Sequence, residues 1–372
     1  APPSGFLALC TSNLPDPVAA IDPAQGGSPQ DYFNTVLYTG NGADNHAISG
    51  VGFQPDWVWM KSRNNARSHA LVDSVRGRGS ILYSDLTNAQ EAPAASNNDL
   101  VSFDTDGFTV GTPERAGSTN TNNDTIVAWN WKAGTSFSND ASSTSVGTID
   151  SAGSVSADTG FSIISYTGTG SAGTIAHGLG AVPNMILVKD RTTAYNWVMY
   201  HSANTAAPET DYLRLNTTDV TADYDMWNDT APTSSVFSVS SYDWVNKSSD
   251  TFIAYCFAEV DGYSKFGSYT GNGSTDGVFL YTGFRPAYVM IKQTNGTTNW
   301  IIMDTARDVY NTMPKFLLAN ATNAEGTDAA SNIDFTSNGF KLRNSNADRN
   351  ASGDTYIYMA FAEQPFKYAN AR

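Results

Sequence analysis

The sequence repeats one module three times, and this repetition constrains the fold more than any other feature. Each copy opens with Y-T-G-x-G, a Pro stands 17 residues after the opening Tyr, and a Lys stands six residues after that Pro. The opening tyrosines are Tyr38, Tyr166 and Tyr269, and the lysines are Lys61, Lys189 and Lys292. A module of about 100 residues can form a small domain alone, unlike a solenoid repeat of about 20 to 50 residues. We therefore expect three globular modules in a row.

The same offsets divide the chain into segments. We expect a Pro-rich arm at 1–35, module 1 at 36–133, a Ser/Thr/Gly-rich linker at 134–159, module 2 at 160–262 and module 3 at 263–372. The segment 134–159 holds almost nothing large and apolar, so its composition is equally consistent with a linker and with an extended surface strand.

Inside each module the pattern is that of strands. Short apolar runs end on the repeated lysines at 56–61, 184–189 and 287–292, which predicts buried strands. Asp-Gly within 103–108 and Asn-Gly within 335–340 lie between phenylalanines and predict hairpins with type I′ turns. No amphipathic helix is longer than about two turns. We predict an all-β protein of three tandem β-sandwich modules, similar to jelly rolls.

Charge excludes some classes of partner. The chain has 36 acidic and 21 basic residues, a net charge of −15, and no Lys/Arg run that could neutralise phosphates, so we expect no nucleic-acid partner. No apolar stretch approaches the length of a membrane span, so we expect no membrane insertion. The chain begins at Ala1 without Met, from which we expect a processed product or a piece of a longer protein.

Catalysis can be tested against the repeats, because a structural position should recur whereas a catalytic one usually occurs once. Asp73 and Arg76 recur as Asp304 and Arg307, with His201 at that place in module 2. The recurrence favours an ion pair or turn clamp over an acid/base role. The sequence has no G-x-S-x-G, no H-E-x-x-H and no Cys pair at metal spacing. We predict no catalytic residue, no cofactor and no metal site.

Three further residue types leave alternatives open. The turn from Asp104 to Asp106 has calcium-like ligands, but module 3 has the same turn without a carboxylate, which favours a plain turn. His69 stands where the other modules have Trp, which favours a packed side chain. Nothing fixes the geometry of a bridge between Cys10 and Cys256, so a disulfide and two free thiols both stay open.

Aromatic residues divide into repeated and unpaired groups. Pairs of Trp at i, i+2 in 57–59 and 129–131 could form a sugar-stacking face, but large apolar residues replace them in the other modules, which predicts core. In module 2, Tyr224, Trp227 and Trp244 have no counterparts and lie among Asp and Asn. They are our candidate ligand-binding residues for a glycan. The alternative is a loop that these rings pin to its own or a neighbouring module.

Several phrases carry a resemblance to a known family. They are A-P-P-S-G-F-L-A-L-C-T at Ala1, Y-F-N-T-V-L-Y-T-G-N-G at Tyr32, G-F-Q-P-D-W-V-W-M-K-S-R at Gly52, D-S-V-R-G at Asp73, S-F-D-T-D-G-F at Ser102 and V-A-W-N-W-K-A-G at Val127. The sequence resembles an uncharacterised domain family of tailed bacteriophages. The resemblance implies the C-terminal part of a longer virion protein, made in bacterial cytoplasm, and supplies no catalytic residues. Module 2 departs from the D-S-V-R-G pattern.

These observations lead to one expected function with two alternatives. We expect a non-enzymatic virion structural protein, a tail fibre, adhesin or capsid-surface fibre, that contacts other virion proteins and host-surface glycans. We expect a homo-oligomer, a trimer if the protein is a fibre. The alternatives are a purely structural capsid decoration or scaffold protein and a polysaccharide depolymerase with two carboxylates about 5 to 9.5 Å apart. Exposure of Trp227 and Trp244 favours the adhesin, and burial of both in module contacts favours the scaffold.

Overall fold

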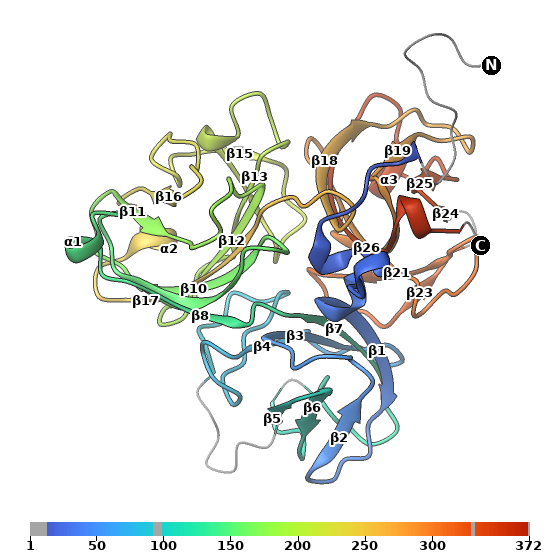
Figure 1. Ribbon diagram of the computed structural model, residues 1–372, viewed down its shortest axis with the longest axis horizontal. Helices are drawn as coiled ribbons and strands as arrows, with labels where there is room; N and C mark the ends of the chain where they lie inside the picture. The colour runs from blue at the N-terminus through green and yellow to red at the C-terminus, as the bar shows by residue number, and fades with distance from the viewer. Residues whose placement is uncertain (1–12, 92–98, 116, 329–331, 371–372) are drawn as a thin grey trace.

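The three modules form a ring of three lobes around a common centre (Figure 1). This computed structural model describes residues 13–91, 99–115, 117–328 and 332–370. Every strand pair in the named sheets is antiparallel, and each module packs a large sheet on a small one, which confirms the predicted all-β sandwich class. The expected row of modules is wrong in arrangement, because one shared core joins all three modules. Cys10 lies outside the described residues.

Module 1 has the simplest large sheet. Its strand order is β1 (Phe33–Thr39), β7 (Thr125–Trp131), β3 (Trp57–Ser62) and β4 (Ala70–Asp73). Its small sheet has the order β2 (His46–Ser49), β6 (Gly107–Val110) and β5 (Leu100–Asp104).

Module 2 has the longest large sheet, with the order β15 (Ala222–Asp223), β14 (Asp211–Arg214), β13 (Val198–His201), β12 (Met185–Asp190), β17 (Thr251–Phe257), β10 (Phe161–Thr167), β9 (Ser151–Ser156) and β8 (Thr135–Asn139). Its small sheet pairs β11 (Gly173–Ala176) with β16 (Val236–Val239). Short helices are α1 (Ala141–Thr144), η5 (Pro208–Thr210) and α2 (Asp243–Asn246). The segment 134–159, for which a linker and a surface strand were both open, supplies β8, α1 and β9 and extends this sheet.

Module 3 repeats the pattern of module 1. Its large sheet has the order β18 (Ser264–Thr270), β26 (Thr355–Pro365), β20 (Phe284–Gln293), β21 (Ile301–Asp304), β22 (Lys315–Leu318) and β23 (Gly326–Thr327). Its small sheet has the order β19 (Phe279–Tyr281), β25 (Gly339–Leu342) and β24 (Ile333–Thr336). The helices are α3 (Ala347–Asn350) and η7 (Phe366–Tyr368).

Both faces of the central strands of each large sheet are buried. On β3, Trp57 and Trp59 point to the shared central core, while Val58 and Met60 point to the core between the two sheets of module 1. All four tryptophans of the two i, i+2 pairs are at most 1% exposed and belong to the central core, as predicted from their repetition. Because side chains alternate along a strand, one strand serves two cores.

The Y-T-G-x-G motif forms the same tie in each module. The tyrosine hydroxyl donates to a backbone carbonyl at 2.6 Å in every copy, namely Tyr38 to Thr119, Tyr166 to Val245 and Tyr269 to Arg349. A Cβ on the first glycine of each motif would lie 2.2 Å from a carbonyl oxygen, and the second glycine has a φ of 65 to 72°. Only glycine fits both positions, which explains why the motif recurs.

The described part of the N-terminal arm packs on the ring. It holds η2 (Ala19–Ile21), η3 (Pro23–Gln25) and η4 (Pro29–Asp31). Ile21 is fully buried in the central core. The Gln30 amide donates to the Glu363 carbonyl at 2.6 Å, and the Tyr368 hydroxyl donates to Asp22 at 2.8 Å. The arm therefore joins the central core to the C-terminal end of module 3.

One backbone hydrogen bond recurs at all three module interfaces. It runs from the N–H of Gln90 to the carbonyl of Arg191 at 2.9 Å, from Thr221 to Thr294 at 2.8 Å, and from Glu325 to Arg63 at 2.7 Å. The accepting residue stands two positions after the repeated lysine each time. Module 1 thus contacts module 2, module 2 contacts module 3, and module 3 contacts module 1 in the same way. The ring is closed, with approximate threefold symmetry within one chain.

At each interface a nitrogen of an aromatic side chain also contacts a backbone carbonyl of the neighbouring module. The module that donates here is the one that accepts in the backbone bond. The indole of Trp197 donates to the Tyr83 carbonyl at 2.7 Å, and that of Trp300 donates to the Arg214 carbonyl at 2.9 Å. His69 takes this place in module 1, with its Nε2 2.9 Å from the Leu318 carbonyl. The histidine is fully buried and packed, in agreement with its pattern in the sequence.

The predicted hairpins form, but their turn type was wrong. In module 1, Asp104 pairs with Gly107, so Thr105 and Asp106 are the central turn residues instead of Asp-Gly. A Cβ on Gly107 would lie 2.0 Å from the Ile48 carbonyl oxygen, and one on Gly339 would lie 1.9 Å from that of Leu280. These glycines are needed for the close approach of the neighbouring strand and do not form the turn.

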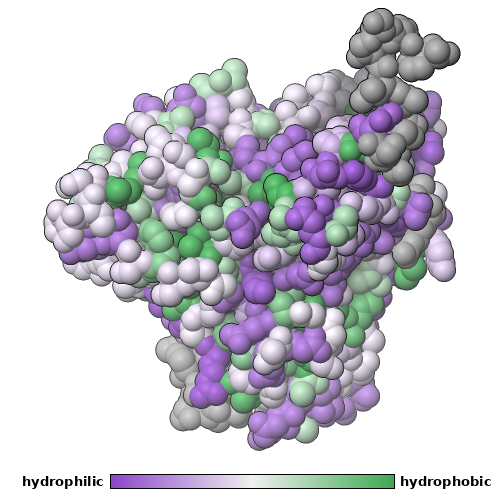
Figure 2. All heavy atoms as spheres, in the orientation of Figure 1, coloured by the Kyte–Doolittle hydropathy of each residue, from purple (hydrophilic) through white to green (hydrophobic). Residues whose placement is uncertain are grey.

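The surface is mixed in character. Polar and apolar side chains are interspersed over the face drawn in Figure 2. In the part of the chain that the structure describes, every helix is too short or too polar to cross a membrane.

Candidate functional site

Asp73 and Arg76 form a buried ion pair at the interface of modules 1 and 2. The Arg76 Nε lies 2.5 Å from Asp73 Oδ2, and both side chains are fully buried. The two Nη atoms of Arg76 donate to the carbonyls of Ser80 and Leu71 at 3.0 and 2.9 Å. The hydroxyl of Tyr255, from module 2, donates to the same Asp73 oxygen at 2.6 Å. The donors of the guanidinium are occupied, so this pair holds structure and offers no group to a substrate.

The copy in module 3 spans the interface with module 1. The Arg307 Nε lies 2.6 Å from Asp304 Oδ2 and its Nη2 donates to the Ile302 carbonyl at 3.0 Å. The indole of Trp129, from module 1, donates to Asp304 Oδ2 at 3.0 Å. Both predicted repeat pairs therefore join neighbouring modules of the ring.

The contacts of the three repeated lysines also indicate a structural role. Burial lowers the pKa of Lys61, Lys189 and Lys292 to about 8. Each Nζ donates to the carbonyl of the following residue, at 2.6, 2.7 and 2.8 Å respectively. A lysine with a lowered pKa can be a catalytic base. The same contact in three modules, however, is typical of a buried lysine that stabilises a turn by donating to its backbone carbonyl.

The calcium-like turn is occupied by protein donors. Asp106 accepts backbone hydrogen bonds from Gly50 and Gly52 at 3.1 and 2.6 Å. Asp104 accepts from the hydroxyls of Ser102 and Thr109, both at 2.7 Å. Within the described ranges, no group of three or more His, Cys, Asp or Glu side chains could hold a metal ion.

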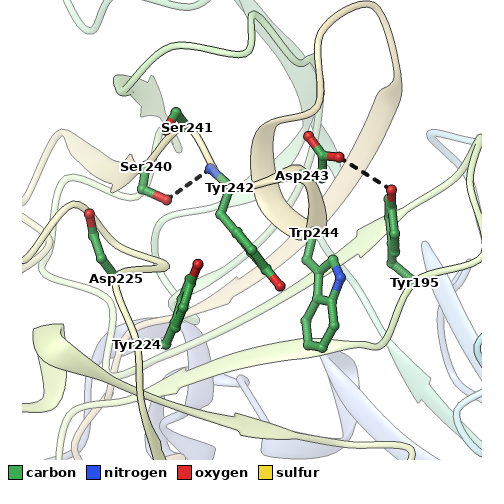
Figure 3. Close-up of a pocket in the computed structure, with 8 residues that line it drawn as sticks. All are labelled: Tyr195, Tyr224, Asp225, Ser240, Ser241, Tyr242, Asp243 and Trp244. Atoms are coloured by element: carbon green, nitrogen blue, oxygen red, sulfur yellow. Dashed lines mark hydrogen bonds between the residues drawn. The ribbon is translucent and has the colours of Figure 1, made fainter.

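A pocket of about 540 Å³ opens on module 2, where its loops depart from the other modules (Figure 3). This aromatic pocket is lined by Tyr195, Tyr224, Asp225, Ser240, Ser241, Tyr242, Asp243 and Trp244. Tyr195 comes from the loop after β12, and Tyr224 and Asp225 follow β15. Ser240, Ser241 and Tyr242 join β16 to α2, and Asp243 and Trp244 lie in the first turn of α2. Two of the three predicted ligand residues, Tyr224 and Trp244, thus lie in one pocket.

Four rings follow one another across the aromatic pocket. The ring centroids of Tyr195 and Trp244 are 6.3 Å apart, those of Trp244 and Tyr242 are 5.4 Å apart, and those of Tyr242 and Tyr224 are 4.6 Å apart. Tyr224 is 48% exposed, and Tyr195, Tyr242 and Trp244 are half-buried. The pocket therefore offers a continuous aromatic surface with accessible faces.

Hydrogen bonds to neighbouring residues fix the turn that carries Tyr242 and Trp244. Its Asn246 is fully buried and donates to the carbonyls of Ser171 and Ser240 at 2.6 and 2.9 Å. The Tyr242 N–H donates to the Ser240 hydroxyl at 3.1 Å. Behind the rings, the Arg214 guanidinium carbon lies 5.4 Å from the centroid of Trp244. These contacts hold the two rings in place before any ligand arrives.

Polar groups stand at both ends of the row of rings. Asp243 accepts a hydrogen bond from the Tyr195 hydroxyl at 3.4 Å, and Asp225 accepts one from the Asp229 N–H at 3.2 Å. Burial raises the pKa of Tyr195, and the charge of Asp243 adds to the effect, so the phenol stays protonated at neutral pH. The pocket thus combines aromatic faces, hydroxyls and two carboxylates.

Trp227 does not belong to this surface, which corrects the prediction for that residue. It is 2% exposed, its indole donates to the Asp211 carbonyl at 3.0 Å, and its ring packs edge-on against Tyr200 at 5.8 Å. It lies in the core between the two sheets of module 2. The aromatic and acidic composition of its loop could not distinguish a ring that turns inward from one that turns outward.

Sequence reasoning missed Tyr195 and Tyr242. The position of Tyr195 is Arg67 in module 1 and Thr298 in module 3, so the criterion that selected Trp244, an aromatic ring without a counterpart, would also have selected Tyr195. Tyr242 stands two residues before the chosen Trp244 but was not itself chosen. Only the fold shows that the loop after β12 faces the loop after β16.

Comparison with known proteins gives a family without an assigned activity. No curated protein matches the sequence. One family model matches residues 28–365, from Ser28, the residue before η4, to the last residue of β26, and so covers all three modules of this chain. The chain belongs to the family described as Domain of unknown function (DUF7483).

Proposed function

We propose that this chain is a non-enzymatic structural protein of a bacteriophage particle, a tail fibre, adhesin or capsid-surface fibre, that contacts host-surface glycans through the aromatic pocket of module 2. The observation that carries the proposal is the row of four accessible rings between two carboxylates. A sugar ring has an apolar face of C–H groups and an edge of hydroxyls. Aromatic faces cover the first, and carboxylates and hydroxyls accept or donate hydrogen bonds to the second.

The closed ring of three modules favours display of a binding site over catalysis. Its three modules share one core and close through the same backbone bond three times, so the aromatic pocket stands on a rigid base. A rigid site with few side chains to order loses less entropy on binding. Each site would be weak, and copies of the protein on one particle would multiply the affinity.

The virion setting rests on the resemblance of the sequence phrases to a tailed-phage family. Other virion proteins would then be the partners, and the particle would be assembled in bacterial cytoplasm. Cys256 is a free, fully buried thiol whose pKa burial raises to about 12, which keeps it unreactive. Homo-oligomerisation, to a trimer in a fibre, stays part of the proposal.

A capsid decoration without a ligand is the second candidate, and the closed ring favours it. Three joined modules with buried interfaces make a stable block whatever the aromatic pocket does. The exposure of the two tryptophans does not favour one candidate, because Trp227 is buried in its own module and Trp244 is half-buried in the lining of the pocket. A depolymerase would use Asp225 and Asp243 as its two carboxylates, and an assay for chain cleavage tests it directly.

The test compares glycan binding of the native chain with that of Trp244→Ala on an array of bacterial surface polysaccharides. We expect Trp244→Ala to lose at least about tenfold in affinity, as removal of a central aromatic contact does. Tyr310→Ala is the control, because Tyr310 is 72% exposed and lies in module 3, outside the aromatic pocket. Equal loss in both variants, or binding to no polysaccharide, would leave only the decoration candidate. Shortening of the bound chains would establish the depolymerase.

Imaging of the intact particle tests the setting. A few copies at the tail would support receptor contact, and copies at every capsid lattice point would support decoration.

A further inference from the structure

We infer that the aromatic pocket selects glycans that carry a positively charged amino group and rejects acidic glycans. The inference deepens the proposed function and rests on it. It follows from the charges of the lining residues and from the ion pairs and hydrogen bonds that the neighbouring cations already make.

The lining of the aromatic pocket carries negative charge only. Its acidic side chains are Asp225 and Asp243, both exposed, and no Lys or Arg of the described residues lines it. Among the described residues, neither carboxylate takes part in an ion pair; each accepts one hydrogen bond, from the Asp229 N–H or the Tyr195 hydroxyl. A carboxylate has about four lone-pair sites, so both keep accepting capacity for a ligand.

Arg214 and Lys247, which lie over the rings of Trp244 and Tyr195, are already paired. Arg214 Nη1 lies 2.7 Å from Asp219, and Arg214 Nη2 donates to the Tyr212 hydroxyl at 2.9 Å. Lys247 Nζ lies 3.1 Å from Asp250 and donates to the Thr193 hydroxyl at 2.8 Å. Neither cation lines the pocket, and each is balanced by its own carboxylate, so the two lining aspartates set the local sign.

The rings reinforce this sign. The face of an aromatic ring carries negative electrostatic potential and attracts an ammonium group placed over it. Lys247 shows this preference, since its Nζ lies 5.8 Å from the centroid of Tyr195. An ammonium on a sugar could therefore contact a ring face and an aspartate together, whereas a carboxylate or sulfate would be repelled by both.

The shape of the aromatic pocket favours an extended ligand. Its four rings stand in sequence instead of around a single point, as Figure 3 shows. A volume of about 540 Å³ lies within the usual range for ligand sites, about 300 to 1,000 Å³. The net charge of −15 acts in the same direction at longer range, because it repels acidic polysaccharides and attracts cationic ones.

The experiment measures affinity for three oligosaccharide probes of equal length by calorimetry at slightly acidic pH. The probes are a glucosamine oligomer, which is cationic, an N-acetylglucosamine oligomer, which is neutral, and a galacturonate oligomer, which is acidic. We expect the glucosamine oligomer to bind at least about tenfold more tightly than the neutral one, and the acidic oligomer to bind least. The preference should shrink when the ionic strength rises from about 0.01 to about 0.1 M, because the Debye length falls from about 30 to about 10 Å.

A pair of variants separates local from global charge. Asp225→Asn/Asp243→Asn should lose the preference for the glucosamine oligomer, and the neutral oligomer should lose less affinity than the cationic one because the amide oxygens still accept hydrogen bonds. Asp261→Asn/Asp276→Asn removes the same net charge from exposed positions outside the aromatic pocket and should keep the preference.

The outcomes distinguish the two proposals. Equal affinity for cationic and neutral probes, or equal loss of preference in both double variants, overturns the charge selection and leaves glycan binding intact. Tightest binding of the galacturonate oligomer also overturns the charge selection. If Trp244→Ala changes the affinity for none of the probes, or if none binds, the proposed glycan site and the inference fall together.

Discussion

Modules 2 and 3 keep the same frame but fill it differently. In both modules the repeated tyrosine, Tyr166 or Tyr269, donates to the turn that follows the small sheet, and a fully buried Asn246 or Asn350 anchors that turn. Module 3 completes its small sheet with β24, whereas the described part of module 2 has two strands there. The positions of Tyr242 and Trp244 are Asn346 and Asp348 in module 3. Repeated residues hold the ring, and the unique residues form the aromatic pocket.

The interfaces differ in a related way. Asp73 accepts from Tyr255 of module 2, and Asp304 accepts from Trp129 of module 1. The equivalent donor position in module 3 is Met359, which has no hydrogen to donate. Module 2 accordingly has His201 in place of the aspartate, and its Nε2 bonds to the Tyr358 carbonyl at 3.2 Å. A buried carboxylate without a donor would be costly, so the two exceptions to the repeat occur together.

The largest effect should come from breaking a repeated ion pair. Asp304→Ala leaves Arg307 buried without its carboxylate and the Trp129 indole without its acceptor, so we expect a loss of about 3 to 5 kcal/mol in the free energy of unfolding. Urea denaturation measures it. Asp276→Ala is the control, because that carboxylate is 82% exposed in its pair with Lys341 and should change stability by less than about 1 kcal/mol. Similar losses for both variants would contradict the structural role of the repeats.

Acid should weaken the interface between modules 2 and 3 through His201. Burial lowers the pKa of His201 to about 4, whereas an unfolded histidine titrates near about 6.5. Its Nδ1 accepts from the Ala203 N–H at 3.2 Å while its Nε2 donates to Tyr358, so the folded chain needs the neutral imidazole. The stabilisation is complete above about pH 6.5 and is lost as the pH falls to about 4, which amounts to about 3 kcal/mol.

The measurement for His201 is the free energy of unfolding across this pH range. His201→Asn should flatten the curve between about pH 6.5 and 4, because the proton uptake on unfolding disappears. Burial lowers the pKa of His69, at the interface of modules 1 and 3, and that of His177 as well, so both histidines should contribute to the remaining slope. An unchanged slope in His201→Asn would show that this interface does not sense acid.

A smaller effect is expected where the small sheets differ. Gly339→Ala places a Cβ 1.9 Å from the Leu280 carbonyl oxygen, which must separate β25 from β19, so we expect a loss of about 1 to 3 kcal/mol. The equivalent residue in module 2 is Val236, because β16 pairs with β11 as β25 pairs with β19. Val236→Ala is the matched variant and should cost less, and thermal unfolding compares the two. A larger loss at Val236 would contradict the comparison.

The repeats made much of the fold predictable. Fixed offsets gave the modules, short apolar runs gave the strands, and the replacement of tryptophan by other large apolar residues placed both Trp pairs in the core. The ring could not be predicted, because its contacts join residues such as Gln90 and Arg191 whose spacing has no local signal. Neither could the Gly107 strand contact, since Asp-Gly is also a common turn pair.

The site was partly predictable for a physical reason. Aromatic residues without counterparts in the other modules are not needed to hold the three modules together. The lack of a counterpart was the criterion that found Tyr224 and Trp244. It could not tell them from Trp227, because all three stand in polar loops and only packing decides which ring turns inward. It also depends on comparing every loop, which is how Tyr195 was missed.

The smallest effect on stability should come from Tyr224→Ala. The ring is 48% exposed and touches Tyr242 at one edge of the aromatic pocket, so its removal should change the free energy of unfolding by no more than about 0.5 kcal/mol. Binding of the probe that the pocket prefers should nevertheless weaken severalfold, because the row of rings becomes shorter. Urea denaturation and calorimetry on the same preparation give both values. A variant that lost stability as Asp304→Ala does would place Tyr224 among the residues that hold the ring, and the division between repeated frame and unique site would fail at this position.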